Sequence, residues 1–228
     1  MDIDQNSFLE IVFKHLYSYI PEWMIPFDND AITQIHHHAV SSLNTSLRFT
    51  INRRTFWQPV CPNPLDTGHM CIYLYFLSRE AVKAGMLDLG DVLFGLNKSL
   101  HSIDLYHSVQ LGPVVHLEHP VGSVIGKGTY GNYVYIGQNV TIGRTMRPCH
   151  SDYPSFGDMV IFTSNVTVVG RCRVGSNVIF ASGTYIKDHD IPSNSIIYGR
   201  SPNLTVRQYE YEEIKAYFSQ MFHLANIA

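Results

Sequence analysis

The stretch FGDMVIFTSNVTVVGRCRVGSNVIFASGTYI, residues 156–186, decides the fold because its large apolar residues recur at every sixth position. A period of six matches neither an α-helix nor a β-strand, so it indicates an internal repeat. A small residue follows four positions after every apolar anchor of this stretch except the last. We interpret each six-residue unit as one flat face of a triangular solenoid whose anchors point inward. The anchors here are Phe156, Phe162, Val168, Val174, Phe180 and Ile186.

The same period extends toward the N-terminus, with a one-residue slip between Leu117 and Val124. Three units close one coil, so the thirteen anchors predict a little over four coils. An antiparallel sandwich would instead show period-two alternation and hairpin turn pairs, and neither is prominent. The sequence therefore favours the solenoid, whose open ends need caps. The earlier anchors are Leu105, Leu111, Leu117, Val124, Tyr130, Ile136 and Ile142.

The flanking segments have the 3.6-residue periodicity of amphipathic helices. Apolar residues at three- and four-residue spacing fill residues 8–20, and similar segments cover 31–47 and the stretch that leads to Ala81. Near the C-terminus, Ile214, Tyr217, Phe218 and Met221 form one helical stripe. We expect an α+β protein with a helical N-terminal domain (1–102), a β-helix (103–203) interrupted by a loop at 144–155, and a C-terminal helix (204–228).

Composition excludes two classes of partner. Of the 228 residues only 15% are charged, and the net charge is -3, so no basic field attracts nucleic acid or anionic lipid. No apolar run is long enough to predict a membrane span, and the N-terminus is acidic where a secretory signal would be basic, so we expect a cytoplasmic protein. The four cysteines form no CxxC pair, and consecutive histidines 36–38 on a helix would point in different directions, so we predict no metal site.

The segment VVHLEHPVGSVIG, residues 114–126, places His116, Glu118 and His119 inside a sequence that otherwise resembles a buried strand. Buried ionisable clusters are costly, and their presence indicates a partner or a catalytic task. A histidine suits proton removal because its reference pKa of about 6.5 leaves it mostly neutral at neutral pH. We predict no role for His116.

Two longer segments resemble a known family. IDLYHSVQLGPVVHLEHPVGSVIG (103–126) and NYVYIGQNVTIGR (132–144) are similar to the serine acetyltransferase branch of the hexapeptide-repeat acyltransferases, which have a left-handed parallel β-helix. The resemblance covers roughly residues 65–203. It implies that acetyl-CoA is the cosubstrate, with no metal, and that the chain forms a homotrimer or a dimer of trimers that acts on a small-molecule acceptor.

The resemblance also implies roles for individual residues. The family's catalytic histidine falls on His119, and the aspartate that orients it falls on Asp104, fifteen residues earlier and close to the eighteen of one coil. The family's acid that contacts the acceptor falls on Glu118. The positions that line the pantetheine arm of acetyl-CoA, in a groove between subunits, fall on Gly143, Thr163 and Ala181.

Two departures from the family pattern bear on the acceptor. The family's second histidine falls on Tyr153, with His150 close by, and we expect these two residues to bind substrate from the loop at 144–155. The acidic DPAC-type motif that grips serine has no counterpart, because RRTFWQP occupies its place.

The main hypothesis is therefore an acetyltransferase that acts on a hydroxyl or amine of a sugar or sugar intermediate of surface polysaccharide biosynthesis. One alternative is a serine O-acetyltransferase of cysteine biosynthesis, and another is a catalytically silent β-helix that serves as an assembly partner. A metal-dependent carbonic anhydrase is disfavoured because His107, His116 and His119 do not have that family's spacing.

Overall fold

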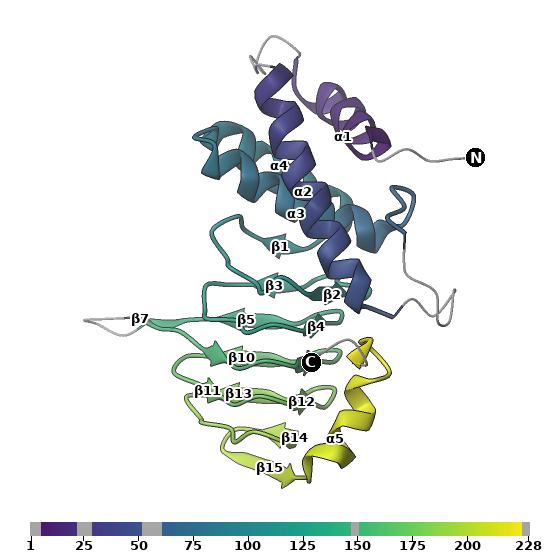
Figure 1. Cartoon of the computed structure of the whole chain (residues 1–228). Helices are drawn as coiled ribbons and strands as arrows, with labels where there is room; N and C mark the ends of the chain where they lie inside the picture. The colour runs from purple at the N-terminus through teal and green to yellow at the C-terminus, as the bar shows by residue number, and fades with distance from the viewer. Residues whose placement is uncertain (1–5, 22–28, 52–60, 147–150, 225–228) are drawn as a thin grey trace.

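Four helices precede the β-helix in the computed structural model, which describes residues 6–21, 29–51, 61–146 and 151–224 (Figure 1). The third helix is the centre of the helical region, since it packs against both the second and the fourth. None of the described helices is both long and apolar enough to cross a membrane. The predicted helical N-terminal region is confirmed. The helices are α1 (Asn6–Tyr19), α2 (Asn29–Phe49), α3 (Thr67–Lys83) and α4 (Leu87–His101).

The predicted solenoid is confirmed as a parallel β-helix with two long ladders and a short third face. The first ladder contains β1 (Asp104–Leu105), β3 (Val124–Ile125), β5 (Thr141–Gly143), β10 (Thr167–Val169) and β13 (Tyr185–Lys187). The second contains β2 (Val115–Leu117), β4 (Val134–Ile136), β9 (Val160–Phe162), β12 (Val178–Phe180) and β14 (Ser195–Arg200). The third face is formed by β8 (Ser155–Phe156) and β11 (Arg173–Val174).

The interior of the coils confirms the six-residue repeat with one exception. All the predicted anchors are buried apart from Val124, which is 44% exposed, while its neighbour Ile125 is 1% exposed. Ile125 pairs in register with Ile142 of the next coil, so it is the inward residue of β3. Large rings stack along the axis, with the centroids of Phe162 and Phe180 5.1 Å apart. The one-residue slip that we expected between Leu117 and Val124 is therefore wrong, and the irregularity there is larger.

A second hydrophobic cluster explains why the strands of the second ladder are buried on both sides. The outward residues of β4, β9, β12 and β14 pack under the C-terminal helix α5 (Tyr211–Phe218), whose Ile214 and Phe218 are fully buried. A strand covered on both faces is apolar at every position, and this is the case for β4, β9 and β12. Tyr217, which we placed on the same stripe, is 46% exposed.

The two ends of the β-helix are capped differently. At the first coil, Ser46 of α2 donates a hydrogen bond to the Val115 carbonyl (2.7 Å), and Tyr75 of α3 donates one to the Val109 carbonyl (2.8 Å). The bond to Val115 satisfies part of the edge of β2, which would otherwise be open to pairing with another chain, and the bond to Val109 holds the segment after β1. At the last coil, β15 (Asn203–Gln208) pairs antiparallel with β14. The segment that we expected to be a C-terminal helix therefore begins with the strand β15, and the short helix α5 that follows lies along the side of the β-helix (Figure 1).

The loop at 144–155 leaves the β-helix as a hairpin of β6 (Thr145–Met146) and β7 (Ser151–Asp152). Figure 1 shows this hairpin on the side of the β-helix away from β2, β4 and the end of α2.

Candidate active site

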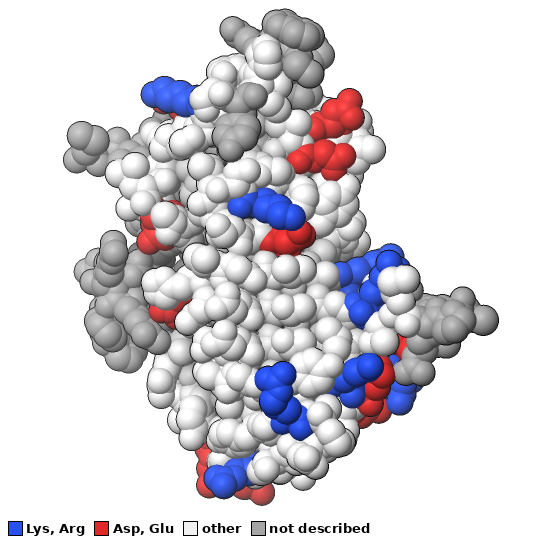
Figure 2. Space-filling view, turned by 180° about the vertical axis from the view of Figure 1, so that it is seen from behind, with Lys and Arg blue, Asp and Glu red and all other residues white. Residues whose placement is uncertain are grey.

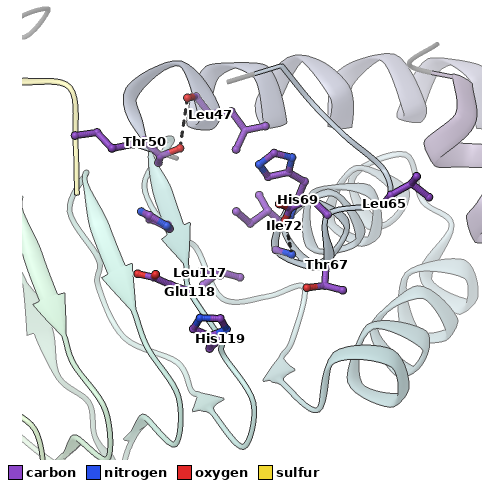
Figure 3. Close-up of a pocket in the computed structure, with 13 residues that line it drawn as sticks. Leu47, Thr50, Leu65, Thr67, His69, Ile72, Leu117, Glu118 and His119 are labelled. Atoms are coloured by element: carbon purple, nitrogen blue, oxygen red, sulfur yellow. Dashed lines mark hydrogen bonds between the residues drawn. The ribbon is translucent and has the colours of Figure 1, made fainter. Parts of the chain in front are cut away.

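A cavity of about 490 Å³ lies where the helical region meets the first coils of the β-helix. The end of α2 and residues 50–51 form one wall, the N-terminal turn of α3 forms a second, and residues 116–119 at the end of β2 form a third. Figure 3 shows Thr67 and His69 of α3 across this cavity from Glu118 and His119. The structure thus brings two of the predicted site residues, Glu118 and His119, together in one pocket.

The corner after β2 is two residues longer than the corner of the next coil. Six residues separate Leu117 from Val124 and four separate Ile136 from Thr141, although each pair is matched in register. The extra length begins at His119, whose φ is 51°, in the left-handed region that few residues other than glycine adopt. Other corners of the coils also contain non-glycine residues with a positive φ, such as Asn139 and Asn165, so the extra length rather than the φ value distinguishes this corner. The inserted corner therefore projects His119 outward from an otherwise regular coil.

The carboxylate of Glu118 is held by the coil below it. Tyr135 of β4 donates a hydrogen bond from its hydroxyl to Glu118 Oε2 over 2.6 Å. The Tyr135 ring also contacts His116 edge to face, with the ring centroids 5.1 Å apart. Sequence reasoning missed Tyr135, because the position looks like an ordinary outward strand residue and only the stacking of coils brings it to Glu118.

Asp104 has a different partner from the one that we predicted. Its Oδ2 accepts a hydrogen bond from Lys98 Nζ of α4 at 2.6 Å, and both side chains are partly exposed. The ring of His119 makes no hydrogen bond within the described part of the chain. The backbone does bring the two residues near one corner, since Asp104 pairs in register with Val124 on the far side of the insertion. The orienting role of Asp104 stays a prediction.

His69 is the second residue that sequence reasoning missed. It lies in the first turn of α3, which Asp66 caps by accepting hydrogen bonds from the backbone N–H groups of Gly68 and His69. The aspartate followed by a helical pattern predicts this cap. The sequence offers no sign that the capped turn faces β2. Gly68 makes the close approach possible, because a Cβ there would lie 3.2 Å from the Leu117 carbonyl oxygen.

The predicted cofactor-binding residues fall on two different edges. Thr163 and Ala181 lie on one edge of the β-helix, one coil apart. They continue a column that begins at Glu118 and passes through Gly137, because the backbone N–H of each member donates to the carbonyl of the residue just before the next member. The hydroxyl of Thr163 also donates to the Phe180 carbonyl at 2.7 Å. Gly143 lies at the end of β5, in register with Val169, and so belongs to the next corner.

Of the two predicted loop residues, the structure describes Tyr153, and it does not line the cavity. Tyr153 follows β7, is 38% exposed, and its ring packs under Lys127 Nζ at 5.7 Å. His150 lies outside the described residues. Within the described ranges, no group of three or more His, Cys, Asp or Glu side chains could hold a metal ion.

Comparisons of the sequence find serine acetyltransferases. Serine acetyltransferase 4 of Arabidopsis thaliana is 27% identical over 138 residues, which cover 60% of this chain and 39% of that protein. The serine acetyltransferase of Synechococcus elongatus is 28% identical over 109 residues, or 47% of this chain and 44% of the relative. The chain thus spans less than half the length of these curated relatives. No family model matches the chain.

Comparisons of the structure find the same group of proteins. The serine acetyltransferase of Neisseria gonorrhoeae has a TM-score of 0.68 at 19% identity, covering 94% of this chain and 84% of that one. A serine acetyltransferase in complex with CoA has a TM-score of 0.61 at 16% identity, covering 89% and 81%. The chain therefore shares their fold across the helical region as well as the β-helix, which supports the predicted left-handed sense.

Proposed function

We propose that the protein is an acetyl-CoA-dependent O-acetyltransferase whose acceptor is serine. The observation that carries this proposal is the lengthened corner after β2, which puts His119 beside Glu118 in a cavity walled by the helical region. Similarity to serine acetyltransferases in sequence and in fold supports the same activity.

His119 is the general base of the proposed reaction. It accepts the proton of the acceptor hydroxyl while the oxygen attacks the thioester carbonyl carbon of acetyl-CoA. When the tetrahedral intermediate collapses, the carbon–sulfur bond breaks and the imidazolium of His119 returns the proton to the departing thiolate. The products are O-acetylserine and CoA, and no metal or redox partner is needed to balance the step.

Acetyl-CoA supplies the acetyl thioester, and a relative has been solved in complex with CoA. In this chain, the column that descends from Glu118 through Gly137 to Thr163 and Ala181 is the candidate wall for the pantetheine arm. Gly137 adds no side chain to this column below Glu118, and its buried backbone is used within the β-helix, where its N–H donates to the Phe162 carbonyl and its carbonyl accepts from the Ser123 hydroxyl. Gly143 lies on a different edge of the β-helix from this column. It can contact the same acetyl-CoA molecule only across an interface, where the Gly143 edge of one copy lies against the column of a neighbouring copy.

The choice of acceptor rests on the comparisons. We predicted a sugar acceptor from sequence because the acidic motif that grips serine is missing, and the relatives named above favour the serine alternative instead. The residues in place of that motif, RRTFWQP (53–59), lie outside the described part of the chain. Glu118 supplies one negative charge in the cavity that can pair with the serine ammonium group.

A homotrimer would explain how the predicted loop residues could bind substrate although they lie on the hairpin side of their own chain. The hairpin that carries Tyr153 lies away from the cavity of its own chain, so it can cover an active site only in a neighbouring copy (Figure 1). Figure 2 shows acidic and basic side chains gathered at the edge that carries the hairpin, whereas the middle of the back face of the β-helix carries few charges, as is typical of a surface buried between subunits. Sedimentation equilibrium tests this assembly, and a monomer at micromolar concentration contradicts it.

The activity is tested by following CoA release from acetyl-CoA in the presence of L-serine or of a panel of sugars and amino sugars, with the product identified by mass. We expect serine-dependent release that is lost in His119→Ala. Release with a sugar at normal enzyme rates, but not with serine, would restore the sugar hypothesis. If no acceptor releases CoA and His119→Ala changes nothing, the protein is the catalytically silent β-helix.

A further inference from the structure

His69 is a buried histidine that the reaction described above does not use. Its side chain lines the same cavity as Glu118 and His119, yet the residue is only 8% exposed. It belongs to the first turn of α3, which the cap from Asp66 and the close approach of Gly68 to β2 hold in place. The ring is therefore fixed at the wall of the cavity.

The hydrogen bond at one ring nitrogen decides where the proton of His69 lies. The backbone N–H of Asn63 donates to His69 Nδ1 at 3.1 Å. A backbone amide can only donate, so Nδ1 must offer its lone pair, and the neutral ring then carries its proton on Nε2. This assignment follows from the hydrogen-bond network, and it leaves Nε2–H as the free donor of the ring.

The charge state of His69 agrees with this assignment. Burial lowers the pKa of His69, and this outweighs the opposing effect of the Asp66 carboxylate. The ring is therefore neutral at neutral pH. Among the described residues, the His69 ring makes no other hydrogen bond than the one from Asn63, so Nε2–H has no acceptor among them.

We propose that His69 is an acceptor-binding residue whose Nε2–H donates a hydrogen bond to an oxygen atom of the substrate. This inference rests on the proposed function and extends it. In serine, the hydroxyl gives its proton to His119, so the oxygens that remain for His69 are those of the carboxylate. The cavity then holds serine between a donor on α3 and the carboxylate of Glu118, which faces the ammonium group.

A substrate comparison tests the contact. Ethanolamine is serine without its carboxylate, so kcat/KM is measured for both acceptors with wild type, His69→Phe and His69→Gln. Because a hydrogen bond to a charged group is worth about 10- to 100-fold in binding, we expect His69→Phe to lose that factor with serine. With ethanolamine the loss should be small, and KM for acetyl-CoA should not change. His69→Gln keeps an N–H donor at the end of its side chain and should restore part of the serine activity.

Two controls separate binding from folding. His101→Gln alters another histidine whose pKa burial lowers, but outside the cavity, and it should leave both acceptors unaffected. Nitrogen-15 spectra of the histidine rings in the wild type should show His69 neutral and protonated on Nε2, without any variant.

The outcomes distinguish the two proposals. Equal losses with serine and ethanolamine, no loss in His69→Phe, or a proton on Nδ1 would each overturn the role of His69 while leaving the acetyltransferase proposal intact. If the wild type acetylates no serine at all, the proposed function fails and the contact to the serine carboxylate fails with it.

Discussion

At the scale of single residues, the position of the His119 side chain depends on an irregularity in the six-residue repeat. Every regular coil places four residues between the two long ladders at this corner, and the first coil places six. His119 lies within this lengthened corner, where its φ is positive, and it lines the cavity. Glu118 remains in the ladder, because its N–H donates to the Ile136 carbonyl, and Tyr135 fixes its carboxylate.

His119→Ala removes the proposed general base. We expect kcat to fall by about 10²- to 10⁴-fold, the usual contribution of such a group, while the KM for serine changes little. The ring makes no hydrogen bond within the described ranges, so the variant should unfold at nearly the same urea concentration as the wild type. Steady-state kinetics with a urea titration checks both statements, and a variant with unchanged kcat would contradict the mechanism.

Asp104 has two possible uses, as the orienting partner of His119 and as the ion-pair partner of Lys98. We expect Asp104→Asn to lower kcat at least tenfold if the carboxylate acts on His119, since it would lose the stabilisation of the imidazolium.

Lys98→Met is the matched control, because it removes the ion pair and keeps the carboxylate. Exposed pairs of this kind contribute about 0–1 kcal/mol to the free energy of unfolding, so the variant should keep its stability. It should also keep its kcat. Equal losses of kcat in both variants would show that Asp104 acts only through the pair with Lys98.

At the scale of elements, the cavity depends on how closely α3 approaches β2. The capped first turn of α3 carries His69, and the absence of a side chain at Gly68 lets the turn sit against the Leu117 carbonyl. Ser46 and Tyr75 hold α2 and α3 onto the first coil through backbone hydrogen bonds. The walls of the cavity thus come from the helical region and from the first coil of the β-helix, which these two hydrogen bonds join.

Gly68→Ala should push these walls apart. Its Cβ would lie 3.2 Å from a backbone carbonyl that cannot rotate away, so we expect a shift of α3 and a higher KM for serine. Gly95→Ala in α4 is the control, because nothing lies within 4 Å of its Cβ. That variant should raise the free energy of unfolding by up to about 1 kcal/mol through helix propensity, and leave the KM unchanged. Parallel changes in the two variants would contradict the steric argument.

At the scale of the whole molecule, buried histidines should make stability depend on pH. Burial lowers the pKa of His69 and of His101 below the ordinary value of 6.5. Between the folded and unfolded pKa values the unfolded chain binds more protons, so acid favours unfolding. The stability is fully present above about pH 6.5 and is lost as the pH falls below it. Asp91, whose pKa is lowered by hydrogen bonds from His107 and Tyr106, contributes only near and below its ordinary value of 3.8.

Urea titrations at several pH values from 7.5 to 5 measure this effect. We expect the free energy of unfolding to decrease by at most about 1.4 kcal/mol per pH unit for each such histidine. His69→Gln should show a shallower decrease than the wild type, and a profile of equal slope would count against a buried neutral His69.

The β-helix could be predicted from sequence because its repeat is local. Each anchor and each small residue occupies a fixed place in a six-residue unit, so counting reveals the coil without knowledge of its neighbours. The same counting gave the wrong inward residue at Val124, because after the insertion Ile125 is the residue that points inward. Spacing alone does not say which of two adjacent apolar residues is buried. The amphipathic helices were predictable for the same local reason.

The sequence by itself determined the repeat, the helices around it, and His119 with Glu118 as the ionisable pair at an irregular corner. Only the tertiary structure decided that α5 covers the side of the β-helix, that Asp104 pairs with Lys98, and that Tyr135 and His69 join the site. The physical reason is sequence separation. A repeat is specified by neighbours six residues apart, whereas His69 reaches the cavity through a helix cap and a glycine contact to a strand about fifty residues later in the chain.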